Sequence, residues 1–117
     1  MRILSIQPFV PSGADFERSC QLFRALGFTE LWNAGGMAGF ERDGCKFLLQ
    51  HFDDRAFAEN FMVNVQLDDV DGFRSGLVER GIPEQFGIRL SEAKNMPWGR
   101  EVNLIDLAGV CWHFVQS

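Results

Sequence analysis

The stretch that decides the fold is "NMPWGREVNLIDLAGVCWHF", residues 95–114. It places a Pro-Trp-Gly corner at 97–99 before an alternating segment, "REVNLID", and a second apolar segment, "VCWHFVQ". Such segments on either side of a short polar and glycine-containing turn predict two neighbouring strands. His113 lies in the second strand. It is either a metal ligand at a catalytic edge or one wall of a pocket that only binds.

Working outward, each half of the chain has the same order of predicted elements: strand, helix, strand, strand, strand. Helices are recognised by apolar spacing of three and four residues, and strands by short apolar runs between glycine breaks. In the first half the expected helix is 14–28, and the expected strands are 2–9, 28–33, 37–42 and 45–52. In the second half the helix is 69–81, and the strands are 61–67, 86–91, 100–106 and 110–116.

The two halves also align with each other. Asp15, the expected helix N-cap, corresponds to Asp69, 54 residues later, and after an insertion at "SEAKNMPWG" the offset becomes 65. A repeat of this size buries too little apolar surface to form a stable core alone, so the halves must pack on each other or on a partner chain. We therefore predict one domain, 1–117, made of two βαβββ repeats at about 1–55 and 58–117. The fold class is α+β, with curved mixed sheets and helices outside.

Composition limits the functions open to the chain. Its 117 residues are 46% hydrophobic and 23% charged, which is typical of a globular domain. The net charge of -5, with no basic stripe, argues against nucleic-acid binding. The acidic surface either serves solubility alone or attracts a cationic ligand. No apolar run is long enough to span a bilayer or to act as a signal peptide. We expect neither nucleic acid nor membrane as a partner.

Cysteine usage predicts the compartment. Cys20, Cys45 and Cys111 are odd in number and form no CxxC pair, so a disulfide framework is not expected. Each lies in an apolar pattern, which predicts buried thiols. A reducing, cytoplasmic location follows.

The duplicated pattern resembles the vicinal-oxygen-chelate superfamily, which includes glyoxalase I, extradiol dioxygenases and the fosfomycin- and bleomycin-resistance proteins. The motifs that carry the resemblance are "LGF" at 26–28, "VQLDDVDGF" at 65–73 and the Asp-x-x-Gly turn at 106–109. Within the superfamily the chain is most similar to bleomycin-resistance proteins. "AGFERD" at 38–43 and "PWGRE" at 97–101, followed by "D-x-A-G-x-C-x-H-F", carry that similarity, although Leu107 replaces the usual proline.

The resemblance also implies site residues. Trp32 and Met37 stand where the family has aromatic residues that stack on the ligand, and Met37 departs from that pattern. Asn64 and Gln66 stand where the family can carry tryptophan. Trp98, in the insertion, is either a residue that stacks on the ligand or part of ordinary packing. Trp112 alternates with His113 in its strand, so if His113 faces the groove, Trp112 faces the helices and belongs to the core. The expected ligand-binding set is Trp32, Met37, Asn64, Gln66, Trp98 and His113.

The resemblance allows a test for metal binding. Metal-dependent members of the superfamily take four ligands from symmetric positions, and the internal offsets place these at Pro8, Met62, Leu48 and His113. Proline and leucine cannot coordinate a metal, and methionine is a poor ligand for a hard divalent ion. A slip of one residue in the alignment brings in Gln7, and a slip of two Gln50. We predict no metal ligands, no cofactor and no catalytic residues. His113 is then a polar group hydrogen-bonded inside the groove or a direct ligand contact.

The preferred function is a metal-independent binding protein of the bleomycin-resistance type. It would sequester a cationic aromatic antibiotic in the groove of a homodimer, and Pro8 stands where the family turns its first strand toward the partner chain. The alternative is a divalent-metal-dependent lyase, transferase or dioxygenase of the same superfamily, so enzyme status stays open. A dimer with only an interaction role is the third possibility.

Overall fold

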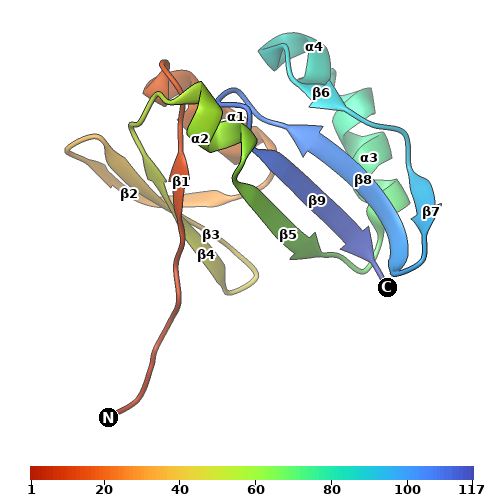
Figure 1. Cartoon of the computed structure of the whole chain (residues 1–117), viewed down its shortest axis with the longest axis horizontal. Coiled ribbons are helices and arrows are strands. Elements are labelled where there is room, and N and C mark those ends of the chain that lie inside the picture. The colour runs from red at the N-terminus through yellow and green to blue at the C-terminus, as the bar shows by residue number, and fades with distance from the viewer. The chain divides into compact units, whose positions relative to one another are not determined.

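The computed structural model describes residues 1–117 and divides the chain into two compact units, Met1–Asp54 and Arg55–Ser117. Each unit is a mixed sheet with its own helices, and the chain traces one unit after the other (Figure 1). Within each unit, one face of the sheet is apolar and carries the helix, while the other face is partly open to solvent.

The first unit has the strand, helix and three strands that the sequence predicts. Its strand order is β1-β4-β3-β2, with β1 parallel to β4 and the remaining pairs antiparallel. The elements are β1 (Phe9–Pro11), α1 (Phe16–Ala25), β2 (Thr29–Ala34), β3 (Met37–Arg42) and β4 (Cys45–Gln50).

The second unit follows the same plan with additions. Its strand order is β5-β9-β8-β6, with β7 paired to β8 and with β5 parallel to β9. The elements are α2 (Arg55–Glu59), β5 (Met62–Gln66), α3 (Val70–Glu79), α4 (Ile82–Phe86), β6 (Arg89–Leu90), β7 (Lys94–Met96), β8 (Gly99–Ile105) and β9 (Cys111–Gln116). Helices with two mixed sheets of this kind confirm the predicted fold class.

Several predicted boundaries were wrong. The strand expected at 2–9 is only Phe9–Pro11, because Pro8 has no N–H to continue the ladder toward the N-terminus. The strand expected at 86–91 is reduced to two residues, since Ile82–Phe86 forms a short helix instead. The insertion forms β7, and α2 connects the two units along the chain.

The long helices begin where the sequence predicts. Asp15 Oδ1 accepts a hydrogen bond from the Arg18 N–H at 3.0 Å, and Asp69 Oδ1 accepts one from the Gly72 N–H at 2.9 Å. Each aspartate thereby satisfies an N–H that the first helical turn leaves free. The C-cap of α1 is Leu26, and the expected cap Gly27 follows it with a φ of 99°.

The core of the first unit is built from phenylalanine. The Phe23 ring on α1 lies 5.0 Å from that of Phe47 and 5.9 Å from that of Phe40, centre to centre, on the helix face of the sheet. Phe28 closes the cluster, with its ring 5.2 Å from that of Phe47. Rings at these separations gain edge and offset-stacking energy in addition to burial. The numerous phenylalanines therefore hold α1 on the sheet and leave the other face free.

The core of the second unit centres on β9. Trp112 and Phe114 are buried, and the Phe114 ring lies 4.4 Å from that of Phe73 on α3. Residues in a strand alternate between its two faces, so Cys111 and His113 lie on the opposite, open face. The prediction that Trp112 belongs to the core is confirmed.

The turn between β8 and β9 is held by a buried carboxylate. Asp106 Oδ1 accepts hydrogen bonds from the backbone N–H groups of Ala108, Gly109 and Val110, at 3.0, 3.1 and 2.9 Å. Its Oδ2 accepts one from the Trp112 indole at 2.9 Å. Burial raises the pKa of Asp106, although these four hydrogen bonds act in the opposite direction. The side chain therefore joins the turn to the core and sets the register of the two strands.

Strand register corrects the alignment of the two halves. In the first unit Phe9 lies opposite Leu48, whereas in the second unit Asn64 lies opposite His113. Phe9 thus corresponds to Asn64, and the offset between β1 and β5 is 55 rather than 54. The position equivalent to Met62 is therefore Gln7 and not Pro8.

The cysteine prediction holds only in part. All three cysteines are free, as expected, but Cys45 is exposed and Cys111 is half-buried, so only Cys20 is a fully buried thiol. Cys45 begins β4 directly after the Asp43-Gly44 turn, where the core does not reach. None of the helices has the length and apolar character that crossing a bilayer requires.

We predict that Asp106→Asn lowers the free energy of unfolding by about 1–3 kcal/mol, the usual cost of an unsatisfied buried group. The asparagine NH₂ must face either the three backbone N–H groups or the Trp112 indole, all of which are donors. Urea denaturation measures the loss. Asp68→Asn, which removes an exposed carboxylate from the same unit, is the control. Equal stability of the two variants would show that the Asp106 network does not hold the turn.

Candidate functional site

The open face of the second sheet carries the polar residues of three neighbouring strands. Asn64 on β5 and Asn103 on β8 both lie directly opposite His113 on β9. Glu101 lies two residues from Asn103 on the same face, as the alternation of the strand requires. Polar side chains from three strands therefore gather on one surface.

A pocket of about 470 Å³ opens on this face. It is lined by Met62, Val63, Asn64, Trp98, Glu101 and His113. The structure thus brings together three of the predicted site residues, Asn64, Trp98 and His113. Gln66, a fourth, lies two residues beyond Asn64, and its Nε2 donates a hydrogen bond to Asn64 Oδ1 at 2.8 Å.

Glu101 organises the pocket, although sequence analysis did not select it. Its carboxylate is 8% exposed, and it accepts a hydrogen bond from Trp98 Nε1 at Oε1, at 2.8 Å. Its Oε2 lies 3.0 Å from His113 Nδ1. Burial disfavours the charged form, but the hydrogen bonds from His113 and Trp98 outweigh burial and lower the pKa of Glu101. An ionised carboxylate therefore lies between Trp98 and His113.

The second nitrogen of His113 points toward the open side of the pocket. Nε2 lies 3.3 Å from the thioether sulfur of Met62, a side chain that is itself 65% exposed. His113 is therefore hydrogen-bonded inside the groove through Nδ1 and accessible through Nε2. The sequence left two roles open for His113, a polar group hydrogen-bonded inside the groove and a direct ligand contact. The geometry of the two ring nitrogens is compatible with both.

Trp98 occupies the rim. Its indole is 56% exposed although its N–H is bonded to Glu101, so the ring is held in place without being covered. The next residue, Gly99, has a φ of 142°, and a Cβ there would lie 2.5 Å from the Gln116 carbonyl oxygen. Only glycine lets the corner close against β9 in this way. The Pro-Trp-Gly corner thus presents an aromatic ring to the pocket.

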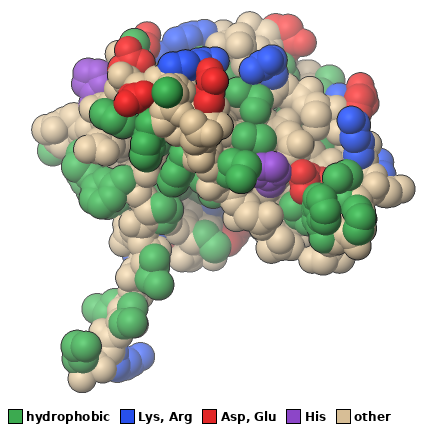
Figure 2. All heavy atoms as spheres, in the orientation of Figure 1, with side chains coloured by type: hydrophobic (Ala, Val, Ile, Leu, Met, Phe, Trp, Pro, Cys, Tyr) green, Lys and Arg blue, Asp and Glu red, His purple; other side chains and the backbone are tan.

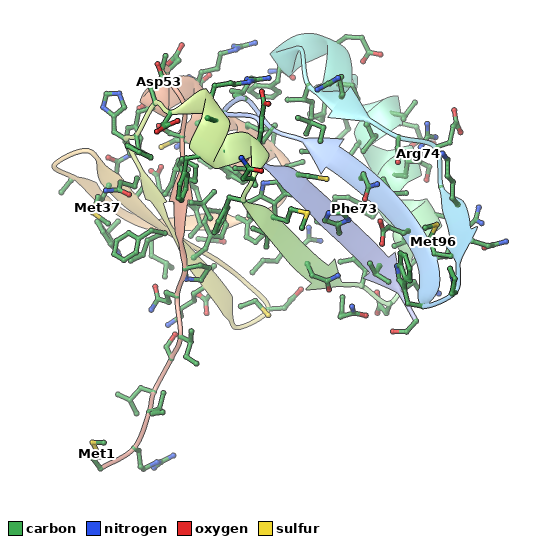
Figure 3. All side chains as sticks on the ribbon, viewed as in Figure 1. Met1, Met37, Asp53, Phe73, Arg74 and Met96 are labelled. Atoms are coloured by element: carbon green, nitrogen blue, oxygen red, sulfur yellow. The ribbon has the colours of Figure 1, made fainter.

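A smaller cavity of about 150 Å³ adjoins this face and shares Glu101 with the first pocket. It is lined by Ser91, Lys94, Met96, Glu101 and Asn103, and Figure 3 labels Met96 on β7 at the sheet edge. Asn103 and Glu101 both line this cavity, and the buried Oδ1 of Asn103 has no hydrogen-bond partner. Buried acceptors without a hydrogen-bond partner are rare in proteins. The Oδ1 atom of Asn103 therefore indicates that the cavity can receive a hydrogen-bond donor.

Cys111 lies on the same open face but is poorly suited to act as a nucleophile. Burial, together with the nearby charges of Glu101 and Asp106, raises the pKa of its thiol. Thiolates are the reactive form of cysteine, and reactive cysteines require the opposite environment. This face therefore lacks an activated nucleophile at Cys111.

The other two predicted residues belong to the first unit. Trp32 on β2 is 46% exposed and lies opposite Gly39 on β3. A Cβ at Gly39 would come within 2.4 Å of Trp32 Nε1, so the indole lies directly on the glycine. Met37 is on β3 next to the Gly35-Gly36 turn, at the end of the hairpin (Figure 3). Phe9 and Leu48 complete an apolar row with Trp32 across the open face of this sheet.

Sequence analysis missed Glu101 and Asn103, yet a signal for them was present. In "REVNLID" the polar residues 101 and 103 alternate with Val102 and Leu104, which are both buried. The same alternation that predicts the strand places residues 101 and 103 on its open face. The hydrogen bonds of Glu101 to Trp98 and His113, in contrast, have no signal in the sequence.

Comparison with known proteins identifies the fold. No protein-family model matches the sequence, and no curated protein matches it. Among solved structures, a bleomycin-binding protein complexed with bleomycin matches with a TM-score of 0.81 and 23% identity, over 97% of this chain and 98% of the other. The chain has the fold of the bleomycin-binding proteins. The resemblance to the vicinal-oxygen-chelate superfamily is thereby confirmed at the level of fold.

Two further matches show the range of this fold. The bleomycin-binding protein of bleomycin-producing Streptomyces verticillus, complexed with copper(II)-bleomycin, matches at a TM-score of 0.80 and 19% identity, over 100% and 98% of the two chains. The fosfomycin resistance protein FosX of Listeria monocytogenes, complexed with Mn(II) and sulfate, matches at 0.75 and 11% identity, over 99% and 92%. The fold is thus found both in antibiotic-binding proteins and in a protein that holds a metal ion.

The residues of this chain do not fit a hard divalent ion such as Mn(II). Of the four positions expected to hold a metal, Leu48 offers no donor atom, Met62 offers a thioether and Gln7 or Pro8 offers no charge. Hard ions prefer carboxylate and water oxygens. Both oxygens of Glu101, the nearest carboxylate, are already engaged by Trp98 and His113. No group of three His, Cys, Asp or Glu side chains in residues 1–117 is arranged to hold a metal ion.

We predict that Gly39→Ala displaces the Trp32 indole, since the added methyl takes the space that the ring occupies. In a Trp98→Phe background the remaining tryptophans are Trp32 and buried Trp112, so any change in exposure reports Trp32. Emission should move to longer wavelength and acrylamide quenching should rise. Gly76→Ala, where a methyl meets nothing within 4 Å, is the control. Unchanged quenching would mean that Trp32 does not rest on Gly39.

Proposed function

We propose that the chain is a metal-independent binding protein that sequesters a cationic aromatic small molecule of the antibiotic class. The observation that carries the proposal is the pocket of the second unit, where an exposed tryptophan ring lies beside an ionised, buried carboxylate. An aromatic face attracts a flat ligand by stacking and a cation by its quadrupole. The fixed negative charge of Glu101 strengthens the attraction for a cation, because burial reduces screening.

Two further observations support a binding role. The excess of acidic residues favours cationic ligands over anionic ones. The bleomycin-binding proteins of the same fold were crystallised with bleomycin and with copper(II)-bleomycin. We infer that Asn64, Gln66, Trp98 and His113 contact a ligand on the second unit. On the first unit, we infer that Trp32 and Met37 offer a separate apolar contact surface. The site requires no cofactor and no catalytic residue.

We also propose that the protein is a homodimer acting in the cytoplasm, where three free cysteines are stable. The N-terminal segment supports dimerisation. Met1–Pro8 belongs to no helix or strand, and its large side chains Ile3, Leu4 and Ile6 are 79%, 88% and 84% exposed. Figure 2 shows these hydrophobic side chains projecting from the body of the molecule. A second copy that covers them removes this apolar area from water.

Bleomycin binding tests the function. We expect bleomycin added to the metal-free protein to change tryptophan fluorescence and raise the melting temperature. Trp98→Ala should weaken binding about tenfold or more, the loss of roughly 1.4 kcal/mol of stacking and cation–π energy. Phe57→Ala, which removes an exposed ring outside the pocket, is the matched control.

Two results would contradict the proposed function. If bleomycin and related aromatic cations leave fluorescence and melting temperature unchanged, the protein does not bind this class of ligand. Elemental analysis provides the second test. Stoichiometric Mn²⁺, Ni²⁺, Zn²⁺ or Fe²⁺ that is retained by the wild type and lost in His113→Ala would favour the metal-dependent enzyme.

The N-terminal segment tests the dimer. We predict that the double variant Leu4→Asp/Ile6→Asp reduces the mass measured by light scattering from that of two chains to that of one, because charges cannot be buried at an apolar contact. Ser5→Asp, a polar position in the same segment, should leave the dimer intact. Pro8→Ala tests the proline separately from the apolar side chains of the segment. An unchanged dimer in that variant would show that Pro8 has no special role in dimerisation. A dimer that persists in the double variant would exclude the segment from the interface.

A further inference from the structure

We propose that Glu101 fixes His113 as a hydrogen-bond acceptor toward the pocket, so that the site selects ligands carrying an N–H donor, such as an amidine or a protonated amine. This inference rests on the proposed function and adds the residue that determines specificity. Glu101 acts through His113 and Trp98 and is therefore a positioning residue.

The first step is the charge on Glu101. The Trp98 indole can only donate, so Oε1 of Glu101 must accept at their 2.8 Å contact. Burial raises the pKa of this carboxyl group, but the contacts with His113 and Trp98 outweigh burial and lower it. Because Oε1 is held by a donor and the pKa is lowered, Glu101 is ionised.

The second step is the tautomer of His113. Oε2 of an ionised Glu101 can only accept, so Nδ1 of His113 carries the proton at their 3.0 Å contact. A neutral imidazole with a proton on Nδ1 has a lone pair on Nε2. The sulfur of Met62, which lies 3.3 Å from Nε2, is only a weak acceptor on an exposed side chain, so in the neutral imidazole it competes poorly with the carboxylate of Glu101 for the single proton. Nε2 is therefore an acceptor that a ligand N–H can satisfy once the exposed Met62 side chain moves aside.

The third step is the class of ligand. Acceptors dominate both cavities on this face: His113 Nε2 in the larger, Asn103 Oδ1 beside the smaller, and the charge of Glu101 shared by the two. Lys94, which is exposed, is the single Lys or Arg among the residues that line them. A ligand group that donates hydrogen bonds and carries positive charge satisfies these acceptors, whereas the charge of Glu101, shared by both cavities, repels a carboxylate.

Glu101→Gln tests the inference, because it keeps the shape of the side chain and reverses one hydrogen bond. The glutamine carbonyl must still accept from Trp98, so its NH₂ faces Nδ1 of His113. The proton then moves to Nε2, and His113 becomes a donor toward the pocket. Glu92→Gln, which removes one exposed acidic charge from the same unit, is the control for charge.

The tautomer is read directly by ¹⁵N NMR of the imidazole, with His51→Gln to assign the two histidines. We expect the proton on Nδ1 in the wild type and in Glu92→Gln, and on Nε2 in Glu101→Gln. Binding is followed by tryptophan fluorescence with benzamidine and benzoate, which share one ring and carry opposite charge. The wild type should prefer benzamidine at least tenfold, and Glu101→Gln should lose that preference while Glu92→Gln keeps it.

The outcomes separate this inference from the function on which it rests. If the wild type binds bleomycin but His113 carries a proton on Nε2, the inference is overturned and the function stands. The same holds if Glu101→Gln keeps its preference for benzamidine. If bleomycin and benzamidine both fail to bind the wild type, the function and the ligand selectivity fall together. The wild-type NMR spectrum decides the tautomer even if Glu101→Gln does not fold.

Discussion

The four hydrogen bonds of the Asp106 carboxylate are the constraint on which the second unit depends. They hold the turn between β8 and β9 and join it to the Trp112 indole in the core. A strand that slips by one residue exchanges its two faces. Such a slip in β9 would turn His113 toward the helix and Trp112 toward solvent. The buried aspartate therefore determines which side chains reach the pocket, although it lies outside the pocket itself.

A second buried carboxylate, Glu101, depends on that register. With β8 and β9 aligned, Asn103 lies opposite His113, and Glu101 lies within reach of both His113 and Trp98. The donors around Glu101 lower its pKa despite burial, whereas burial prevails at Asp106 and raises the pKa there. The two acids have different roles: Asp106 stabilises a turn, and Glu101 holds Trp98 and His113 in place on the open face.

The open faces of the two sheets have different chemistry despite their common topology. In the first unit the cross-strand row contains Phe9, Leu48, Gly39 and Trp32, and in the second unit the equivalent strands place Asn64, His113 and Asn103 in a row. The same strand arrangement thus carries an apolar open face in the first unit and a polar open face in the second.

Local patterns in the sequence were sufficient to predict the repeated elements, the helix caps at Asp15 and Asp69, and the burial of Trp112, because alternation, helical spacing and capping act over a few residues. The same patterns failed at Pro8, where a missing N–H ends β1, and at Cys45, which lies outside the core. Only the tertiary structure showed that Gln7 and not Pro8 corresponds to Met62, because register is set by pairing between distant strands. Only the tertiary structure brought Glu101 to Trp98 and His113, because those hydrogen bonds depend on a turn that a buried side chain holds in place.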